Sequence, residues 1–186
     1  VSDEVCEHII FDGYERQSVM RYPKLAERSF VVFSFGKTYH ATGWKAGYCM
    51  APANLMAEFR KAHQFMVFSV NTPLQYALAD YMNSTPSYES ISAFYQQKRD
   101  LFLKLTKKSR FKPLACSGSY FQLFDYSAIS QEKDTDFAIR LTKEFGVASI
   151  PVSVFYKNPV DHKILRFCFA KEDETLEKAA AKLCQI

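Results

Sequence analysis

The chain has 186 residues, of which 48% are apolar and 16% aromatic, and a formal net charge of +4. This length can bury a substantial core in one or two domains, and this apolar content excludes an intrinsically disordered protein. Because the charge is spread along the chain and no apolar run approaches the roughly 18 residues that span a bilayer, we expect neither nucleic acid nor a membrane as a partner.

The chain begins with the residues "VSDEVCEHIIFDG", which start in mid-strand and place Asp3 at the end of that strand. No initiator methionine precedes them, so we expect a fragment of a longer protein. The apolar run "FVVFSF" then predicts a buried strand over about residues 30 to 35, and "AGYCMA" predicts a short strand. These strands indicate an α/β arrangement for the first part of the chain.

Two helices are predicted after these strands. The first, "NLMAEFRKAHQFM", would have Asn54 as its N-cap. The second, "NTPLQYALADYMN", would be capped by Asn71 or Thr72, and Pro73 suits its first turn. The sequence "STPS" that follows has the composition of a hinge. We therefore place a domain boundary there, between residues 1–84 and 85–186.

The second part of the chain predicts a smaller α+β domain. A long amphipathic helix runs from Tyr88 to about Lys107, with a stripe of core positions at Ile91, Phe94, Tyr95, Lys98 and Phe102. Strands are predicted in "GSYFQLFDY", "VASIP" and "KILRFCFA". Helices are predicted in "DTDFAIRLTKEFG", which Gly146 would close, and in "EDETLEKAAAKLCQ".

The cysteines and histidines argue against disulfides and metal binding. The five cysteines are odd in number and scattered, which fits reduced, packed thiols: Cys6, Cys49, Cys116, Cys168 and Cys184. The four histidines lack the spacing of metal ligands: His8, His40, His63 and His162. The N-terminal residues carry acids where a signal peptide would have basic charge, so we expect a cytoplasmic protein.

The stretch "SFGKTYHATGWK" contains a lysine, Lys37, directly after a buried strand. The "GKT" could end a phosphate-binding loop, but that loop needs a glycine where this chain has Val31, and a β-branched residue resists the positive φ of such a turn. A nucleotide-binding module is therefore disfavoured. A solvated lysine in an ordinary loop remains an alternative to a chemical role for Lys37.

Arg166 lies within the apolar strand "KILRFCFA". A buried charge needs a partner, and the planar guanidinium suits a carboxylate, so Arg166 is expected to face a ligand; the alternative is an arginine on the outer face of an alternating strand. An acid (Asp3), a lysine (Lys37) and a carboxylate-binding arginine are the groups that pyridoxal phosphate chemistry requires. Their spacing alone does not prove that function.

Several longer segments resemble one family over essentially the whole chain. "SDEV", "SFGKTYHATGWKAGY", "FSVNTPLQYALAD", "GSYF" and "IPVSVFYKNPVDHKILRFCFAKEDETL" look like the C-terminal half of class I, fold type I pyridoxal phosphate-dependent aminotransferases. The nearest branch holds kynurenine/glutamine and bacterial methionine aminotransferases. The resemblance implies that residues 1–84 are the C-terminal part of the large cofactor-binding α/β domain and residues 85–186 the small α+β domain.

The resemblance also implies roles for individual residues. Lys37 would be the Schiff-base lysine and the base that moves a proton between the substrate Cα and the cofactor. Asp3 would pair with the pyridinium nitrogen, although it could equally cap a turn. Ser34 and Lys45 would bind the cofactor phosphate, and Arg166 would hold the substrate α-carboxylate.

Further implied contacts involve aromatic and loop residues. Phe68 and Ser69 would lie on a loop contributed to the neighbouring subunit's site in a homodimer with shared active sites, or on a plain loop. Phe155 would line the substrate pocket, or simply pack. Cys6 stands where the family has a tyrosine that hydrogen-bonds the cofactor O3′, and a thiol is a shorter and weaker donor. We expect this departure to weaken activity near neutral pH.

The predicted function is therefore transamination from an amino acid (methionine, aromatic or glutamine-like) to a 2-oxo acid. In the family, the first half of the protein supplies the remaining cofactor and substrate contacts, so we expect this chain alone to be an incomplete, inactive fragment. The alternative is a non-catalytic aminotransferase-like fragment that serves binding or dimer assembly, which Cys6 favours.

Overall fold

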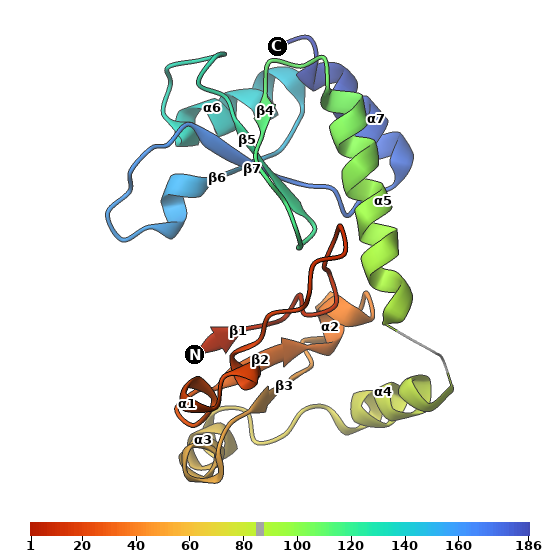
Figure 1. The fold of residues 1–186 in the computed structure, drawn as a ribbon, viewed down its shortest axis with the longest axis vertical. Helices are drawn as coiled ribbons and strands as arrows, with labels where there is room; N and C mark the ends of the chain where they lie inside the picture. Colours follow the sequence, from red (N-terminus) through yellow and green to blue (C-terminus); the bar gives the residue numbers. More distant parts are fainter. Residues whose placement is uncertain (85–87) are drawn as a thin grey trace. The chain divides into compact units, whose positions relative to one another are not determined.

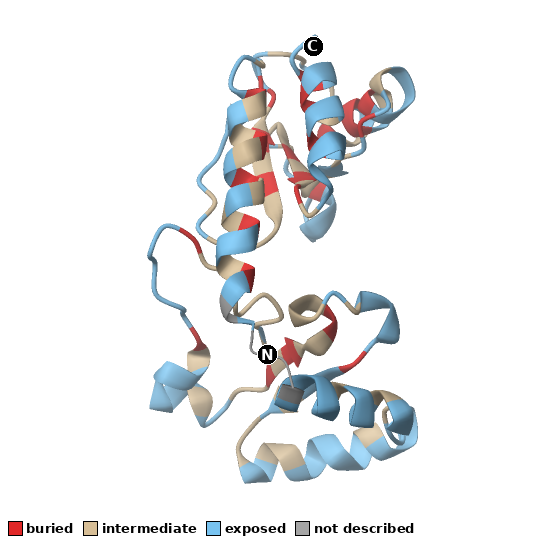
Figure 2. Ribbon diagram, turned by 90° about the vertical axis from the view of Figure 1, so that its right-hand side faces the viewer, coloured by how far each residue is buried: buried red, intermediate tan, exposed pale blue. Residues whose placement is uncertain are grey.

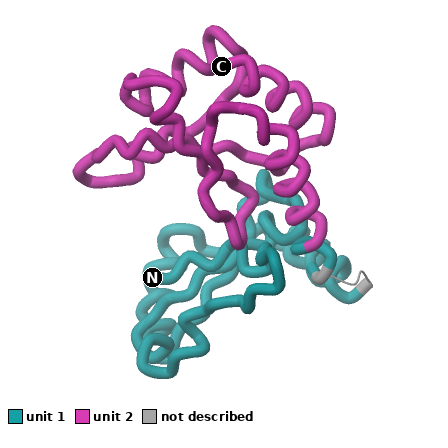
Figure 3. The backbone as a smooth tube through the Cα atoms, turned by 45° about the horizontal axis from the view of Figure 1, so that its top comes forward, with its two compact units in different colours: residues 1–92 teal, residues 93–186 magenta. Residues whose placement is uncertain are grey.

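A computed structural model describes residues 1–84 and 88–186 of the chain. It divides into two compact units, residues 1–92 and residues 93–186 (Figure 3). Residues 85–87, which are the last three residues of the hinge predicted in "STPS", lie outside the described residues. The predicted domain boundary after residue 84 therefore stays a prediction.

Unit 1, residues 1–92, is built on a three-stranded mixed sheet with the order β1-β2-β3. Strand β1 is parallel to β2, and β3 is antiparallel to β2. Its elements are β1 (Ser2–Asp3), the 3₁₀ turn η1 (Val19–Arg21), α1 (Pro23–Ala26), β2 (Val31–Ser34), α2 (Phe35–Thr38), the 3₁₀ turn η2 (Thr42–Trp44), β3 (Gly47–Met50), α3 (Ala53–Met66) and α4 (Thr72–Ser84) (Figure 1).

Strand β2 forms the centre of this sheet and alternates between two environments. Val31 and Phe33 are buried, with 0% and 3% of their surface exposed, whereas Val32 and Ser34 are half-buried. The Phe33 ring stacks on Tyr48 of β3 with 4.6 Å between ring centroids. The strand predicted from "FVVFSF" is thus present, with one face in the core and one face less covered.

The two helix caps predicted in unit 1 differ in outcome. The Asn71 side-chain oxygen accepts a hydrogen bond from the Leu74 amide at 3.2 Å, which confirms Asn71 as the cap of α4. The predicted cap at Asn54 is wrong, because α3 begins one residue earlier with Pro52 at the cap position. The Pro52 carbonyl already accepts from the Met56 amide at 2.8 Å, which places Asn54 inside the first turn.

Unit 2, residues 93–186, contains a four-stranded antiparallel sheet with the order β4-β5-β7-β6. Helix α5 (Glu89–Thr106) begins in unit 1 and continues into unit 2. The other elements are β4 (Lys112–Pro113), β5 (Phe121–Asp125), α6 (Asp134–Arg140), the π-helical turn η3 (Leu141–Phe145), β6 (Ile150–Pro151), the 3₁₀ turn η4 (Val152–Phe155), β7 (Ile164–Cys168) and α7 (Asp173–Leu183) (Figure 1). Among the described residues, none of the helices combines the length and apolar character needed to cross a membrane.

The core of unit 2 is a cluster of phenylalanines between the sheet and its helices. Phe124 of β5 and Phe167 of β7 have rings 5.7 Å apart, and both contact Phe102 of α5. Phe137 of α6 is fully buried and stacks on Phe111 at 6.2 Å. Figure 2 shows buried positions on both the helices and the strands of this unit. The alternation of β5 and β7 leaves Phe121 and Arg166 on the other, less covered face.

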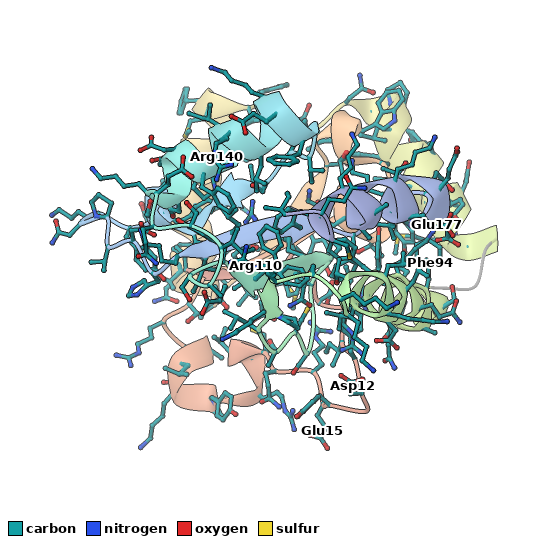
Figure 4. All side chains as sticks on the ribbon, turned by 90° about the horizontal axis from the view of Figure 1, so that it is seen from above. Asp12, Glu15, Phe94, Arg110, Arg140 and Glu177 are labelled. Atoms are coloured by element: carbon teal, nitrogen blue, oxygen red, sulfur yellow. The ribbon has the colours of Figure 1, made fainter. Side chains whose placement is uncertain are left out.

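Most of the predicted stripe on α5 is in the core, but not all of it. Ile91, Tyr95 and Phe102 are buried, and the Lys98 ammonium pairs with Asp173 of α7 at 2.6 Å. Phe94 is 45% exposed and borders the stripe, so its placement in the core is wrong (Figure 4). Its ring instead packs edge-on against Tyr95, with centroids 5.1 Å apart.

Candidate active site

The sheet of unit 1 brings several candidate residues to one edge. Asp3 is the last residue of β1 and Ser34 is the last residue of β2. Because the two strands are parallel, with Asp3 opposite Val32, their carboxyl ends lie at the same edge of the sheet. This is the position at which open α/β sheets bind ligands.

Lys37 is held at this edge by the short helix α2. The Ser34 hydroxyl caps the helix by accepting a hydrogen bond from the Lys37 amide at 3.3 Å, and the Thr38 hydroxyl donates to the Ser34 carbonyl at 3.2 Å. Gly36 lies against the returning loop, where a Cβ would come within 3.0 Å of the Ala41 carbonyl oxygen. The glycine of "GKT" therefore serves close packing, and the lysine follows it in a fixed turn.

Lys45 approaches the same edge from the opposite direction. It is exposed, has a left-handed backbone with φ of 55°, and precedes β3 by two residues. Gly47, the first residue of β3, pairs with Ser34, the last residue of β2. A Cβ at Gly47 would lie 2.4 Å from the Phe33 carbonyl oxygen, so only glycine permits this pairing. The pairing brings the segment of Lys45 to the Ser34 end of β2.

Asp3 and Cys6 occupy the turn after β1. One Asp3 carboxylate oxygen accepts a hydrogen bond from the Val5 amide at 3.2 Å, and the residue is exposed. The side chain thus stabilises its own turn, as the alternative interpretation expected, while its exposure leaves the carboxylate accessible. Cys6 is half-buried, and its carbonyl accepts from the Ile9 amide at 2.9 Å.

A charged network centred on Glu7 adjoins this turn. The Glu7 carboxylate accepts from the Tyr48 hydroxyl at 3.1 Å, pairs with Arg16 at 2.5 Å, and lies 3.4 Å from Nε2 of His8. Burial, followed by the charge and hydrogen bond of Glu7, raises the pKa of Tyr48 to about 12. Burial lowers the pKa of His8 despite the opposing effect of Glu7, and Arg16 lowers it further. His8 also stacks on Tyr88, with ring centroids 4.2 Å apart.

In unit 2, Arg166 occupies the middle of β7 between Leu123 of β5 and Ile150 of β6. Its guanidinium carbon lies 4.0 Å from the centroid of the Phe121 ring and 4.9 Å from that of Phe155. Its Nε is buried and has no hydrogen-bond partner among the described residues. Arg166 is therefore on the less covered face of an alternating strand, yet two aromatic rings contact it and a buried donor is left for an anion.

Phe68 and Ser69 lie elsewhere in unit 1, in the loop between α3 and α4. Phe68 is 78% exposed and has a positive φ of 66°. The preceding residues Phe65 and Met66 are 87% and 82% exposed. This loop presents an apolar surface, and no hydrogen bond or ring contact within the described part of the chain ties Phe68 or Ser69 to the edge that carries Lys37.

A separate apolar cavity of about 340 Å³ lies within unit 1 between α4 and β3. Phe35, Tyr48, Leu78 and Met82 contribute to its lining. Neither Asp3 nor Lys37 lines it, so the cavity does not coincide with the charged edge of the sheet.

The candidate residues thus form two groups, one in each unit. Asp3, Ser34, Lys37 and Lys45 share one sheet edge in unit 1. Arg166 and Phe155 are in contact in unit 2. Sequence reasoning missed Phe121, which makes the shorter contact with Arg166, because that contact depends on the pairing of β5 with β7. The alternation in "YFQLF" places Phe121 on the same face of the sheet as Leu123, the residue opposite Arg166. That alternation is the sequence signal for a contact between Phe121 and Arg166.

Sequence comparison gives one consistent family. The profile of "Aminotransferase class I and II" matches residues 1–183. The chain is 52% identical over 187 residues to a methionine aminotransferase of Escherichia coli K12, covering 100% of this chain and 48% of that protein. It is 35% identical to a kynurenine–oxoglutarate transaminase of Dictyostelium discoideum, with coverage of 100% and 48%. The chain spans about half the length of the curated relatives it matches.

Structural comparison agrees. The chain matches a crystal structure of an Escherichia coli protein with methionine aminotransferase function at a TM-score of 0.94 and 52% identity, covering 100% of this chain and 49% of the other. It matches N-succinyldiaminopimelate aminotransferase from Mycobacterium tuberculosis at 0.91 and 30% identity, covering 98% and 48%. The predicted α/β fold type of these enzymes is thereby confirmed over the length of the chain.

Proposed function

The chain belongs to the class I and II aminotransferases, a family that uses pyridoxal phosphate, and we propose that the protein moves an amino group from an amino acid to a 2-oxo acid. The observation that carries this proposal is the gathering of Asp3, Ser34, Lys37 and Lys45 at one sheet edge. The Lys37 amine matches the aldehyde of pyridoxal phosphate, and the Asp3 carboxylate matches its ring nitrogen. The Ser34 hydroxyl and the Lys45 ammonium match its phosphate. The residues therefore fit this cofactor.

Each residue has a defined task in this proposal. When bound, the cofactor supplies an aldehyde that bonds to amines and a ring that accepts electrons from the substrate. Lys37 would hold the cofactor covalently. Once the substrate amine has displaced it, the freed and neutral Lys37 amine would take the proton from the substrate Cα. Asp3 keeps a proton on the ring nitrogen. Ser34 and Lys45 bind the phosphate by a hydrogen bond and a point charge.

Arg166 is the proposed site for the substrate α-carboxylate. Its buried, unpartnered Nε and the two rings against it favour a planar anion that accepts two parallel hydrogen bonds. Phe155 is 60% exposed beside it and offers apolar surface to the substrate side chain. We propose methionine as the first amino donor to test, because the 52% identical relative is a methionine aminotransferase. Aromatic and glutamine-like amino acids remain in the proposed range.

We also propose a cytoplasmic homodimer. The exposed loop with Phe68 and Ser69 offers apolar surface that a second subunit would cover, and this loop would complete the partner's active site. The five cysteines are all free thiols, which fits a reducing compartment.

Reduction of the cofactor complex with borohydride tests the proposal. The chain is mixed with pyridoxal phosphate, reduced and peptide-mapped by mass spectrometry. We expect a phosphopyridoxyl group at Lys37 that disappears in Lys37→Arg and persists in Lys61→Arg, a control at an exposed lysine of α3. Labelling spread evenly over surface lysines, or none, would overturn the catalytic role of Lys37 in this chain. That result would favour the alternative of a non-catalytic, aminotransferase-like binding or assembly unit, in line with Cys6.

A further inference from the structure

The turn that carries Phe155 is anchored by a buried carboxylate from another element. Asp134, the first residue of α6, is 2% exposed. One of its carboxylate oxygens accepts a hydrogen bond from the Ser153 amide at 2.8 Å, and the other accepts from the Ser153 hydroxyl at 2.7 Å. Both oxygens of Asp134 are thus committed to one residue of η4. Charge-assisted hydrogen bonds of this kind are among the stronger ones in proteins.

Apart from Ser153 and the half-buried Val152, the side chains of this turn are exposed. Turn η4 has four residues and closes with a hydrogen bond of 3.1 Å from the Tyr156 amide to the Ser153 carbonyl. Val154, Phe155 and Tyr156 are each more than half exposed, whereas Ser153 is 7% exposed. The packing of the three exposed side chains therefore fixes the turn only weakly. Ser153 is its buried anchor.

The same turn is connected to Arg166 at both of its ends. Strand β6 leads into η4, and its residue Ile150 pairs with Arg166 across the sheet. Phe155 ends η4, and its ring lies 4.9 Å from the guanidinium carbon. Ser153 lies between these two points. A displacement of Ser153 would therefore move the Phe155 ring away from Arg166.

We propose that Asp134 is a positioning residue for the carboxylate site: acting through Ser153, it holds Phe155 against the Arg166 guanidinium. The ring limits the rotamers of Arg166 and excludes water from one side of it, which strengthens its bond to a carboxylate. This inference rests on the proposed role of Arg166. It adds a residue that touches neither substrate nor cofactor.

The role of Asp134 differs from that of an ordinary acidic residue at a helix start. Asp136 lies in the same first turn of α6 and has the same charge, but it is exposed and makes no side-chain hydrogen bond within the described part of the chain. Any effect of charge on the helix dipole is common to both residues. Asp136→Asn is therefore the matched control for Asp134→Asn.

Nuclear magnetic resonance of the full chain tests the inference. The probe is hydrocinnamate, a simple carboxylate with an aromatic end, and the signals are the Arg166 Nε–H, assigned with Arg166→Lys, and the Phe155 ring protons. We expect Asp134→Asn and Ser153→Ala to shift both signals in the free chain and to weaken hydrocinnamate binding by about tenfold, a loss between those expected for an exposed and for a desolvated cation–π contact. Asp136→Asn should leave signals and affinity unchanged.

The outcomes separate the two claims. If both variants fold and leave the Arg166 and Phe155 signals unchanged, the positioning role is overturned, whatever the wild-type chain binds. If the variants shift these signals but hydrocinnamate does not perturb Arg166 in the wild-type chain, the link is supported and the proposed carboxylate role of Arg166 fails. Should Asp134→Asn not fold, Ser153→Ala decides alone. It removes only the hydrogen bond from the Ser153 hydroxyl, and the Asp134 carboxylate still accepts the hydrogen bond from the backbone amide of residue 153.

Discussion

The Tyr48 hydroxyl donates a hydrogen bond of 3.1 Å to the Glu7 carboxylate, although the two residues are 41 positions apart in the sequence. This contact connects strand β3 to the turn that follows β1. Arg16 binds the other Glu7 oxygen at 2.5 Å. The network therefore holds the turn containing Cys6 against the sheet, next to the edge that carries Asp3 and Lys37.

The first prediction concerns the titration of Tyr48. Its pKa is raised from 10.0 to about 12 by burial and then by Glu7. The stability that this group contributes is therefore fully present below about pH 10 and is lost as the pH rises through about 12. Tyrosinate absorbance should show one late-titrating phenol that is absent in Tyr48→Phe. Glu7→Gln should move this titration to lower pH, and an unshifted phenol in that variant would contradict the assigned cause.

A second prediction concerns His8, which shares the Glu7 carboxylate. Burial lowers its pKa below 6.5, Glu7 partly offsets this effect, and Arg16 adds to it. Since the folded-state pKa is the lower one, the stability from His8 is present above about pH 6.5 and is lost as the pH falls through the folded-state value. Glu7→Gln should lower the pKa of His8 further, as followed by its imidazole proton resonances. A rise in that variant would show that Glu7 is not the opposing charge.

The third prediction tests the cap of α2. Ser34→Ala removes the acceptor of the Lys37 amide and should lower the free energy of unfolding by about 1 kcal/mol, the usual value of an N-cap. Ser34→Asn should retain most of that stability, because asparagine is an equally good cap. Urea unfolding followed by circular dichroism measures both variants. Equal losses in the two would mean that the serine hydroxyl stabilises the chain in another way.

The fourth prediction contrasts two positions of α6 that are two residues apart. Phe137 is 0% exposed, and its ring lies 4.5 Å from that of Tyr126. Phe137→Ala should cost about 3–5 kcal/mol in unfolding free energy, because it leaves a cavity in the phenylalanine cluster. Ile139 is 53% exposed, and Ile139→Ala should change stability by no more than about 0.5 kcal/mol. A similar loss at both positions, measured by urea unfolding, would place the core of unit 2 elsewhere.

Local patterns predicted much of this fold because local interactions determine it. The alternation in β7, the cap at Asn71 and the left-handed Gly146, with φ of 63°, each follow from neighbouring residues. The predicted N-cap at Asn54 was wrong because Pro52 occupies the cap position of α3. The predicted burial of Phe94 was wrong because helical spacing defines the border of an apolar stripe only to within about one residue.

The candidate site was predictable only where it is local. Lys37 could be placed at the end of a strand, since "FVVFSFGK" contains both the strand and the turn. The contact of Phe121 with Arg166 requires the register of β5 on β7. The hydrogen bond between Asp134 and Ser153 spans 19 positions in the sequence. Such pairings depend on tertiary packing, which no periodicity in a single sequence records.

Cys6 stands at the position for which the family resemblance implies a tyrosine. It lies three residues after Asp3, in the turn held by the Glu7 network, and its thiol is half-buried. A thiol is a weak hydrogen-bond donor, whereas the phenolic hydroxyl of the tyrosine that the resemblance implies would donate to the cofactor O3′. Such a donor would stabilise an anionic O3′ and would favour the deprotonated form of a cofactor bound to Lys37.

The final prediction is that Cys6→Tyr lowers the pKa of the lysine-bound cofactor. One hydrogen bond to a charged oxygen is worth about 1.5–3 kcal/mol, which corresponds to a decrease of about one to two pH units. The measurement is a spectrophotometric pH titration of the chain loaded with pyridoxal phosphate, with Cys6→Phe as the control of similar size that lacks the hydroxyl. A lower pKa in the tyrosine variant alone would mean that the turn after β1 faces the cofactor and that Cys6 limits the wild-type site. Identical titrations of the two variants would place the Cys6 side chain away from O3′, and the proposed orientation of this turn would then be wrong.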